Sequence, residues 1–134
     1  MALWQGKKYR LETSENFDDY MKELGIGWLL RTIGNNTSAT VELVEEADGS
    51  YSFITDSTFR RSVMKFKPGE EFDEETIDGR NVKSVCTFDG PNKFIQEQKG
   101  SKPTTIVREF KEDELITTLT IGNVTSIRKY KLVV

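Results

Sequence analysis

The side chains of this sequence that could do chemistry are cations and neutral hydrogen-bond donors rather than nucleophiles. The chain has no histidine, which excludes serine–histidine and cysteine–histidine catalysis and nearly all zinc chemistry. Its one cysteine, Cys86, cannot form an internal disulfide, indicates a reducing compartment and is expected to be a small wall residue. Catalysis by carboxylate, lysine or tyrosine side chains stays open, but no motif supports it. We therefore expect no catalytic residue, no metal site and no cofactor.

The cations of interest are three arginines that share strand faces with large apolar side chains. Side chains alternate between the two faces of a strand, so residues 80–88, 93–98, 104–110 and 126–132 each present two sets to compare. In each segment the more apolar face should turn inward, and it also carries polar side chains. These are Arg80, Gln96, Gln98, Arg108, Arg128 and Tyr130.

A face of this composition does not suit a dry protein core. Burying an unpaired ion is costly, whereas a wide barrel that holds water and an anionic amphiphile would accept the arginines. The alternative is that they lie on the solvent face, because a bulge shifts the alternation of the side chains that follow it. Periodicity alone leaves both interpretations open.

Turn signals predict an all-β chain from about residue 37 onward. Turns such as Asp48-Gly49, Pro68-Gly69 and Gly122-Asn123 recur about every ten residues, a spacing typical of an up-and-down barrel or a sandwich. A first strand around residues 6–13 brings the total to about ten strands, provided that a break falls near Ser57–Phe59.

Residues 14–36 have a helical pattern instead. Asn16 is placed to cap a helix over residues 17–24, whose apolar side chains fall on one face. After two glycines, a second apolar helix over residues 28–33 is predicted to end in a left-handed cap at Gly34-Asn35-Asn36. The predicted order is therefore one strand, two short helices and then strands only.

Length and charge favour a single small domain over residues 1–134. The 19 basic and 22 acidic residues are interspersed and give a net charge of −3, so no basic block is available for nucleic acid. The first fourteen residues lack the apolar run of a signal peptide, and nothing approaches the roughly 20 apolar residues of a membrane span. We expect a cytoplasmic monomer.

Three separated motifs resemble one protein family. They are Asn16–Lys22, Lys65–Glu74 and Thr104–Glu109, and they occur in that family's order and spacing. They resemble the intracellular lipid-binding proteins, and within them the heart, muscle and adipocyte type of fatty-acid-binding protein, particularly an invertebrate muscle form. The similarity extends from about residue 4 to residue 132.

The resemblance implies a fold, a function and a head-group site. The fold is a ten-stranded antiparallel β-clam barrel, with a helix-turn-helix lid over about residues 16–36 between the first two strands. The implied function is intracellular binding and transport of a long-chain fatty acid, without catalysis. The ligand carboxylate would contact Arg128 and Tyr130 directly and Arg108 largely through water.

The resemblance also implies a portal and a tail-binding wall. The matching positions are Phe17, Tyr20, Met21, Ile26, Leu30, Phe59, Asp78 and Arg80. For the lid residues the alternative is a helix face that packs on the barrel rim. Phe59 could instead be a buried strand end, and the pair formed by Asp78 and Arg80 could be purely structural. The sequence departs from the family at Gly6, which lies one residue early and predicts a one-residue insertion in the first strand.

Two other functions compete with fatty-acid transport by a barrel of this kind. One is a membrane-docking interaction protein, and the other is a carrier of another hydrophobic carboxylate such as a retinoid. An enzyme that acts on a lipid is a third, more distant alternative. The lid segment, residues 14–36, holds four acidic side chains against two basic ones, which disfavours tight adsorption to anionic lipid and leaves transient membrane contact open.

Overall fold

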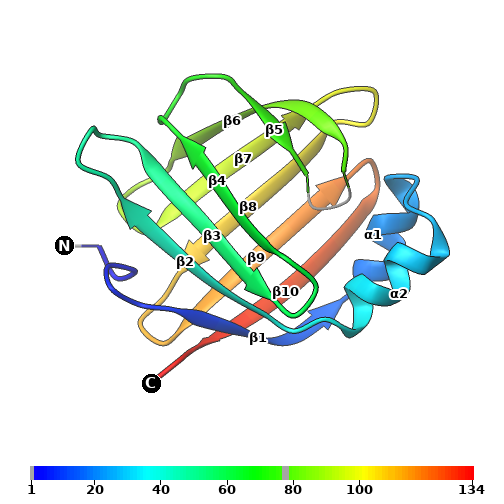
Figure 1. Cartoon of the computed structure of the whole chain (residues 1–134), viewed down its shortest axis with the longest axis horizontal. Coiled ribbons are helices and arrows are strands. Elements are labelled where there is room, and N and C mark those ends of the chain that lie inside the picture. Colours follow the sequence, from blue (N-terminus) through cyan, green and yellow to red (C-terminus); the bar gives the residue numbers. More distant parts are fainter. Residues whose placement is uncertain (1, 77–78) are drawn as a thin grey trace.

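The computed structural model describes residues 2–76 and 79–134, and most of them form one sheet of ten antiparallel strands (Figure 1). In chain order the elements are β1 (Tyr9–Glu15), α1 (Phe17–Glu23), α2 (Trp28–Asn36), β2 (Ala39–Glu45), β3 (Tyr51–Ser57), β4 (Arg61–Phe66), β5 (Phe72–Glu75), β6 (Asn81–Phe88), β7 (Lys93–Lys99), β8 (Thr104–Phe110), β9 (Glu114–Ile121) and β10 (Val124–Leu132). The predicted all-β fold with two helices between its first two strands is confirmed.

The sheet curls into a barrel that stays open along one seam. Its strand order is β4-β3-β2-β1-β10-β9-β8-β7-β6-β5. Short connections join most neighbouring strands; the exceptions are β1 and β2, which α1 and α2 connect, and β1 and β10, the first and last strands. The two edge strands, β4 and β5, follow each other in the chain. Near this seam the Arg60 guanidinium lies 3.8 Å from the Glu75 carboxylate, in an exposed ion pair of the kind that contributes little to stability.

The strand faces alternate as the sequence predicted, because the strands are regular and one face of each is covered by the interior. Most of the inward set is buried, namely Ser84, Cys86, Phe94, Gln96, Gln98, Thr104, Ile106, Phe110, Ser126 and Arg128. Arg80, Arg108 and Tyr130 of the same faces are half-buried and line the cavity. The outward lysines of the same strands, such as Lys83, Lys99 and Lys129, are exposed. The solvent-face alternative for Arg128 is therefore wrong.

Aromatic rings fill the end of the barrel away from the helices. Phe94 stacks against Phe66 at 5.6 Å and against Phe110 at 6.4 Å between ring centroids, and Trp4 and Tyr9 complete this cluster. A second, smaller cluster lies beneath the lid; its buried residues are Tyr20, Met21, Ile106, Leu119 and Ile121. Burial of these large side chains is the main force that stabilises the fold.

Two predicted helix boundaries need correction: the start of the first helix at Asn16 and the end of the second helix near Gly34. Asn16 adopts a left-handed conformation with φ 58° and makes no side-chain cap; its Nδ2 reaches the carbonyl oxygen of Thr125 at 3.4 Å instead. Helix α2 continues through Gly34 to Asn36, and the residue that follows it, Thr37, has an extended backbone conformation. A Cβ at residue 34 would lie 3.0 Å from Met21 Sδ, so this glycine allows α2 to approach α1 closely rather than ending the helix.

Polar contacts hold the two helices together as one lid. The Asp18 carboxylate accepts hydrogen bonds from Arg31 Nε at 3.2 Å and from Asn35 Nδ2 at 3.0 Å. The lid is tied to the barrel by Lys102, whose Nζ donates to the Glu23 carbonyl at 2.7 Å. None of the described helices has the length and apolar character needed to cross a membrane.

The first strand, in which the early glycine predicted a one-residue insertion, contains an irregularity in its pairing with β10. Leu11 pairs with Tyr130 and Thr13 pairs with Lys129. Between these pairs β1 advances by two residues while β10 advances by one. The additional residue is Glu12, and such a bulge bends the strand locally.

Candidate functional site

A cavity of about 270 Å³ lies between the helices and the inner wall of the barrel. Most of its wall is apolar, including Phe17, Met21, Phe53, Ile106 and Leu119. Polar side chains are gathered at particular places on this wall rather than scattered. Such a cavity fits a largely apolar molecule with a few polar atoms at defined positions.

The two innermost arginines lie in one row across neighbouring strands. Arg108 on β8 pairs with Thr117 on β9, and Thr117 pairs with Arg128 on β10. Adjacent strands lie about 4.8 Å apart, so the Cα atoms of the two arginines are roughly 10 Å apart. Two long side chains from these positions can reach the same small anion, with the Thr117 hydroxyl between them. Tyr130 follows Arg128 on the same strand face, and it also lines the cavity.

Arg108 is held against aromatic rings and an amide. Its Nη1 donates to Gln96 Oε1 at 2.6 Å, and its Cζ lies 4.4 Å from the centroid of the Phe53 ring and 5.3 Å from that of Phe94. Desolvation by burial lowers the pKa of the Arg108 guanidinium, although an arginine keeps its charge in such a setting. The cation is thus costly to bury and would be stabilised by an anion in the cavity.

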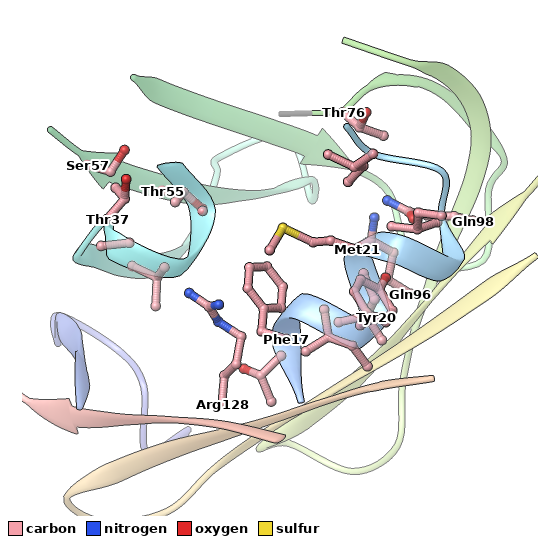
Figure 2. A pocket seen from close by; sticks show the side chains of 18 of the residues that line it. Phe17, Tyr20, Met21, Thr37, Thr55, Ser57, Thr76, Gln96, Gln98 and Arg128 are labelled. Atoms are coloured by element: carbon pink, nitrogen blue, oxygen red, sulfur yellow. The ribbon is translucent and has the colours of Figure 1, made fainter. Parts of the chain in front are cut away.

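Arg128 has still fewer partners. Its side chain is 8% exposed; Nη1 donates to Ser14 Oγ at 3.3 Å, and Cζ lies 3.7 Å from the centroid of the Phe17 ring (Figure 2). Within residues 2–76 and 79–134, neither Arg108 nor Arg128 forms an ion pair with a carboxylate. Arg108 and Arg128 therefore lie on one wall as internal cations that no carboxylate among the described residues neutralises.

A carboxylate on the facing wall was missed by the sequence reasoning. Glu74 Oε1 accepts hydrogen bonds from Ser84 Oγ at 2.6 Å, Gln96 Nε2 at 2.8 Å and Gln98 Nε2 at 3.2 Å. Because Gln96 also accepts from Arg108, it links the carboxylate to the guanidinium. In the sequence, the alternation of Phe72, Glu74 and Thr76 could have indicated that Glu74 faces inward. Strand β5 has only four residues, which is too short for an alternating pattern to be convincing.

The described residues that were expected to line the portal and tail wall surround the same cavity. They are Phe17, Tyr20, Met21, Ile26, Leu30, Phe59 and Arg80; Asp78 lies outside the described residues. Figure 2 shows Met21 reaching from α1 into the cavity, with Thr55 and Ser57 on one side and Gln96 and Gln98 on the other. Phe59 is 44% exposed between β3 and β4, so it is not the buried strand end that was the alternative.

Neither a reactive thiol nor a metal site is found among the described residues. Burial raises the pKa of the Cys86 thiol to about 12, which leaves it protonated and unreactive at neutral pH. In the part of the chain that the structure describes, no three acidic or sulfur side chains gather in a way that could hold a metal ion. The remaining features are an apolar cavity and its buried cations.

The chain is a β-barrel protein with a curled antiparallel sheet, a helical lid and a largely apolar internal cavity lined in part by arginines, an arrangement that suits a small amphiphilic ligand. The chain belongs to the lipocalin / cytosolic fatty-acid binding protein family, whose model matches residues 5–133. It is 46% identical over 127 residues to a muscle fatty acid-binding protein of Schistocerca gregaria, with 94% of each chain covered.

Solved structures of similar proteins have the same fold. A fatty acid-binding protein from brain tissue of Drosophila melanogaster is 62% identical, with 96% of this chain and 98% of that chain covered and a TM-score of 0.90. A Schistosoma mansoni fatty acid binding protein, solved in complex with arachidonic acid, is 43% identical, with 100% and 98% covered and a TM-score of 0.95.

Proposed function

We propose that this protein binds a long-chain fatty acid in its internal cavity and carries it through the cytoplasm as a monomer. Arg128 and Tyr130 would contact the ligand carboxylate directly, and Arg108 would reach it largely through water. The observation that carries this proposal is the pair formed by the buried Arg128 and the half-buried Arg108, which have no carboxylate ion-pair partner in the described part of the chain and line a largely apolar cavity.

The chemistry of the wall supports a fatty acid over a neutral lipid. A guanidinium presents a planar set of donors that matches a carboxylate, and a tyrosine hydroxyl adds one neutral donor. The hydrocarbon chain would supply most of the affinity, at about 0.8 kcal/mol for each buried methylene before entropic costs. The names of the relatives, which describe fatty-acid binding, agree with this assignment.

We propose a carrier rather than an enzyme. The chain has no histidine, and its one thiol is kept protonated by burial, so the common routes to acyl transfer are missing. The family to which the chain belongs is one of binding proteins.

The test is to identify and then titrate the ligand. Mass spectrometry of lipid extracted from the purified protein should find long-chain fatty acids, and titration of the delipidated protein with oleate should give one internal site. Retinoids or neutral lipids as the main extracted species, with oleate bound weakly, would contradict the assignment.

The lid also favours transient contact with membranes as a route of delivery. Trp28 and Leu29 on α2 are 69% and 60% exposed, next to a cavity whose wall includes Leu30. If the lid docks on bilayers, transfer of a fluorescent fatty acid to vesicles should accelerate with vesicle concentration, and Trp28→Ser should abolish that dependence. A transfer rate independent of vesicle concentration in the wild type would indicate release into water instead.

A further inference from the structure

The lid contributes an aromatic ring to the cationic end of the cavity. Phe17, the first residue of α1, lies over Arg128 with 3.7 Å between the ring centroid and Cζ (Figure 2). The Phe17 ring also packs against Tyr20, with 6.0 Å between the ring centroids and an interplanar angle of 13°. At such a distance the ring attracts the cation electrostatically. A residue expected to touch the ligand tail thus contacts a head-group arginine.

This stacking leaves the edge of the guanidinium available. Arginine has five N–H donors in the plane of its guanidinium, and within the described residues the one hydrogen bond of Arg128 is that from Nη1 to Ser14. A carboxylate approaches a guanidinium in that plane, whereas Phe17 occupies a face above it. The ring and a bound carboxylate can therefore contact Arg128 at the same time.

We propose that Phe17 is a positioning residue through which the lid selects ionised over neutral ligands, a role that rests on the proposed function. The Phe17 ring covers one face of the Arg128 guanidinium and keeps water from that face. The N–H edge is thereby held toward the cavity. An ion pair formed at the edge is stronger where water is excluded, because the local dielectric constant falls. A neutral ligand of equal length gains nothing from this arrangement and meets Phe17 only as apolar wall.

The test compares oleate with oleyl alcohol, which has the same chain but no charge. Phe17→Leu keeps an apolar side chain and removes the ring, so oleate affinity should fall about three- to tenfold more than alcohol affinity. Phe17→Tyr, which keeps the ring, should restore the preference for the acid. Phe59→Leu is the matched control, since Phe59 lines the same cavity and has no cation–π contact within the described residues; it should affect both ligands equally. Equal losses for both ligands in Phe17→Leu would overturn the proposal.

Two further measurements separate this inference from the proposed function. Arg128→Gln should remove the preference for the acid, and adding Phe17→Leu to it should change that preference no further. If Arg128→Gln weakens oleate binding more than alcohol binding and Phe17→Leu weakens both equally, only the inference about Phe17 fails. If Arg128→Gln also weakens both ligands equally, the proposed head-group site fails as well. In the wild type, the Arg128 Nε–H proton resonance should be shifted upfield by the ring and stay so with oleate bound. If this resonance instead has the chemical shift of an exposed arginine, the stacking of Phe17 on Arg128 is overturned, even if Phe17→Leu fails to fold.

Discussion

Replacing Arg128 with glutamine tests the head-group site through the difference between a charged and a neutral ligand. The Arg128 side chain is 8% exposed and has no carboxylate partner among the described residues, so a ligand carboxylate would be its first full counter-ion. Hydrogen bonds to charged groups contribute about 1.5–3 kcal/mol. At about 1.4 kcal/mol for each factor of ten, Arg128→Gln should weaken oleate binding roughly ten- to a hundredfold.

The assay is calorimetric titration of wild type and variant with oleate and with oleyl alcohol. Alcohol binding should scarcely change, because the alcohol has no carboxylate to lose. Lys129→Gln is the control, since it removes the same charge from the next residue, which is exposed on the outer face. The empty Arg128→Gln variant should melt no earlier than the wild type, because a buried cation is removed. Equal losses for acid and alcohol would refute the reasoning and assign Arg128 to the shape of the cavity.

Three further results are expected. Phe59→Ala, at the exposed portal position, should change stopped-flow association and dissociation rates more than equilibrium affinity; unchanged rates would remove Phe59 from the gate. The Cys86 thiol, whose pKa burial raises to about 12, should react with a thiol reagent at pH 8 only as fast as the protein unfolds; rapid labelling of the folded protein would contradict this. Hydrogen bonds from Ser50 lower the pKa of Asp48 from 3.8 to about 2, so its ionised form stabilises the fold above pH 4 and this stabilisation is lost as the pH falls toward 2. The stability difference between wild type and Asp48→Asn should therefore shrink over that range, and a constant difference would show that the charge of Asp48 is irrelevant.

Alternation made much of the wall predictable. Regular strands with one covered face carry their side chains in a strict period of two, which is why the sequence could offer the inward placement of Gln96, Arg108 and Arg128 as one of two interpretations. The break between β3 and β4 was only a condition for reaching ten strands, because no turn signal marks it; the structure confirms it, with β3 ending at Ser57 and β4 beginning at Arg61. The roles of these side chains toward a ligand came from the resemblance, because periodicity says which residues face inward and not what they bind.

The remaining features depend on geometry that local patterns do not encode. Thr117 falls between the two arginines through the register of three strands, and Glu74 lies on a strand too short to show its alternation. Asn16 was expected to cap a helix from its residue type alone, yet its left-handed backbone directs the side chain to β10. The contact between Phe17 and Arg128 depends on how the lid packs over the barrel, which is a tertiary arrangement that no local pattern in the sequence records.

The protonation state of the bound head group tests the central proposal most directly. Oleate labelled with carbon-13 at its carboxyl group can be followed by NMR through a pH titration while bound. Nearby cations favour the ionised form, so the pKa of the bound carboxyl should lie below that of an ordinary carboxyl and should rise in Arg128→Gln. A bound carboxyl that titrates at or above its ordinary pKa in the wild type would show that it lies away from Arg108 and Arg128, and would contradict the proposed site.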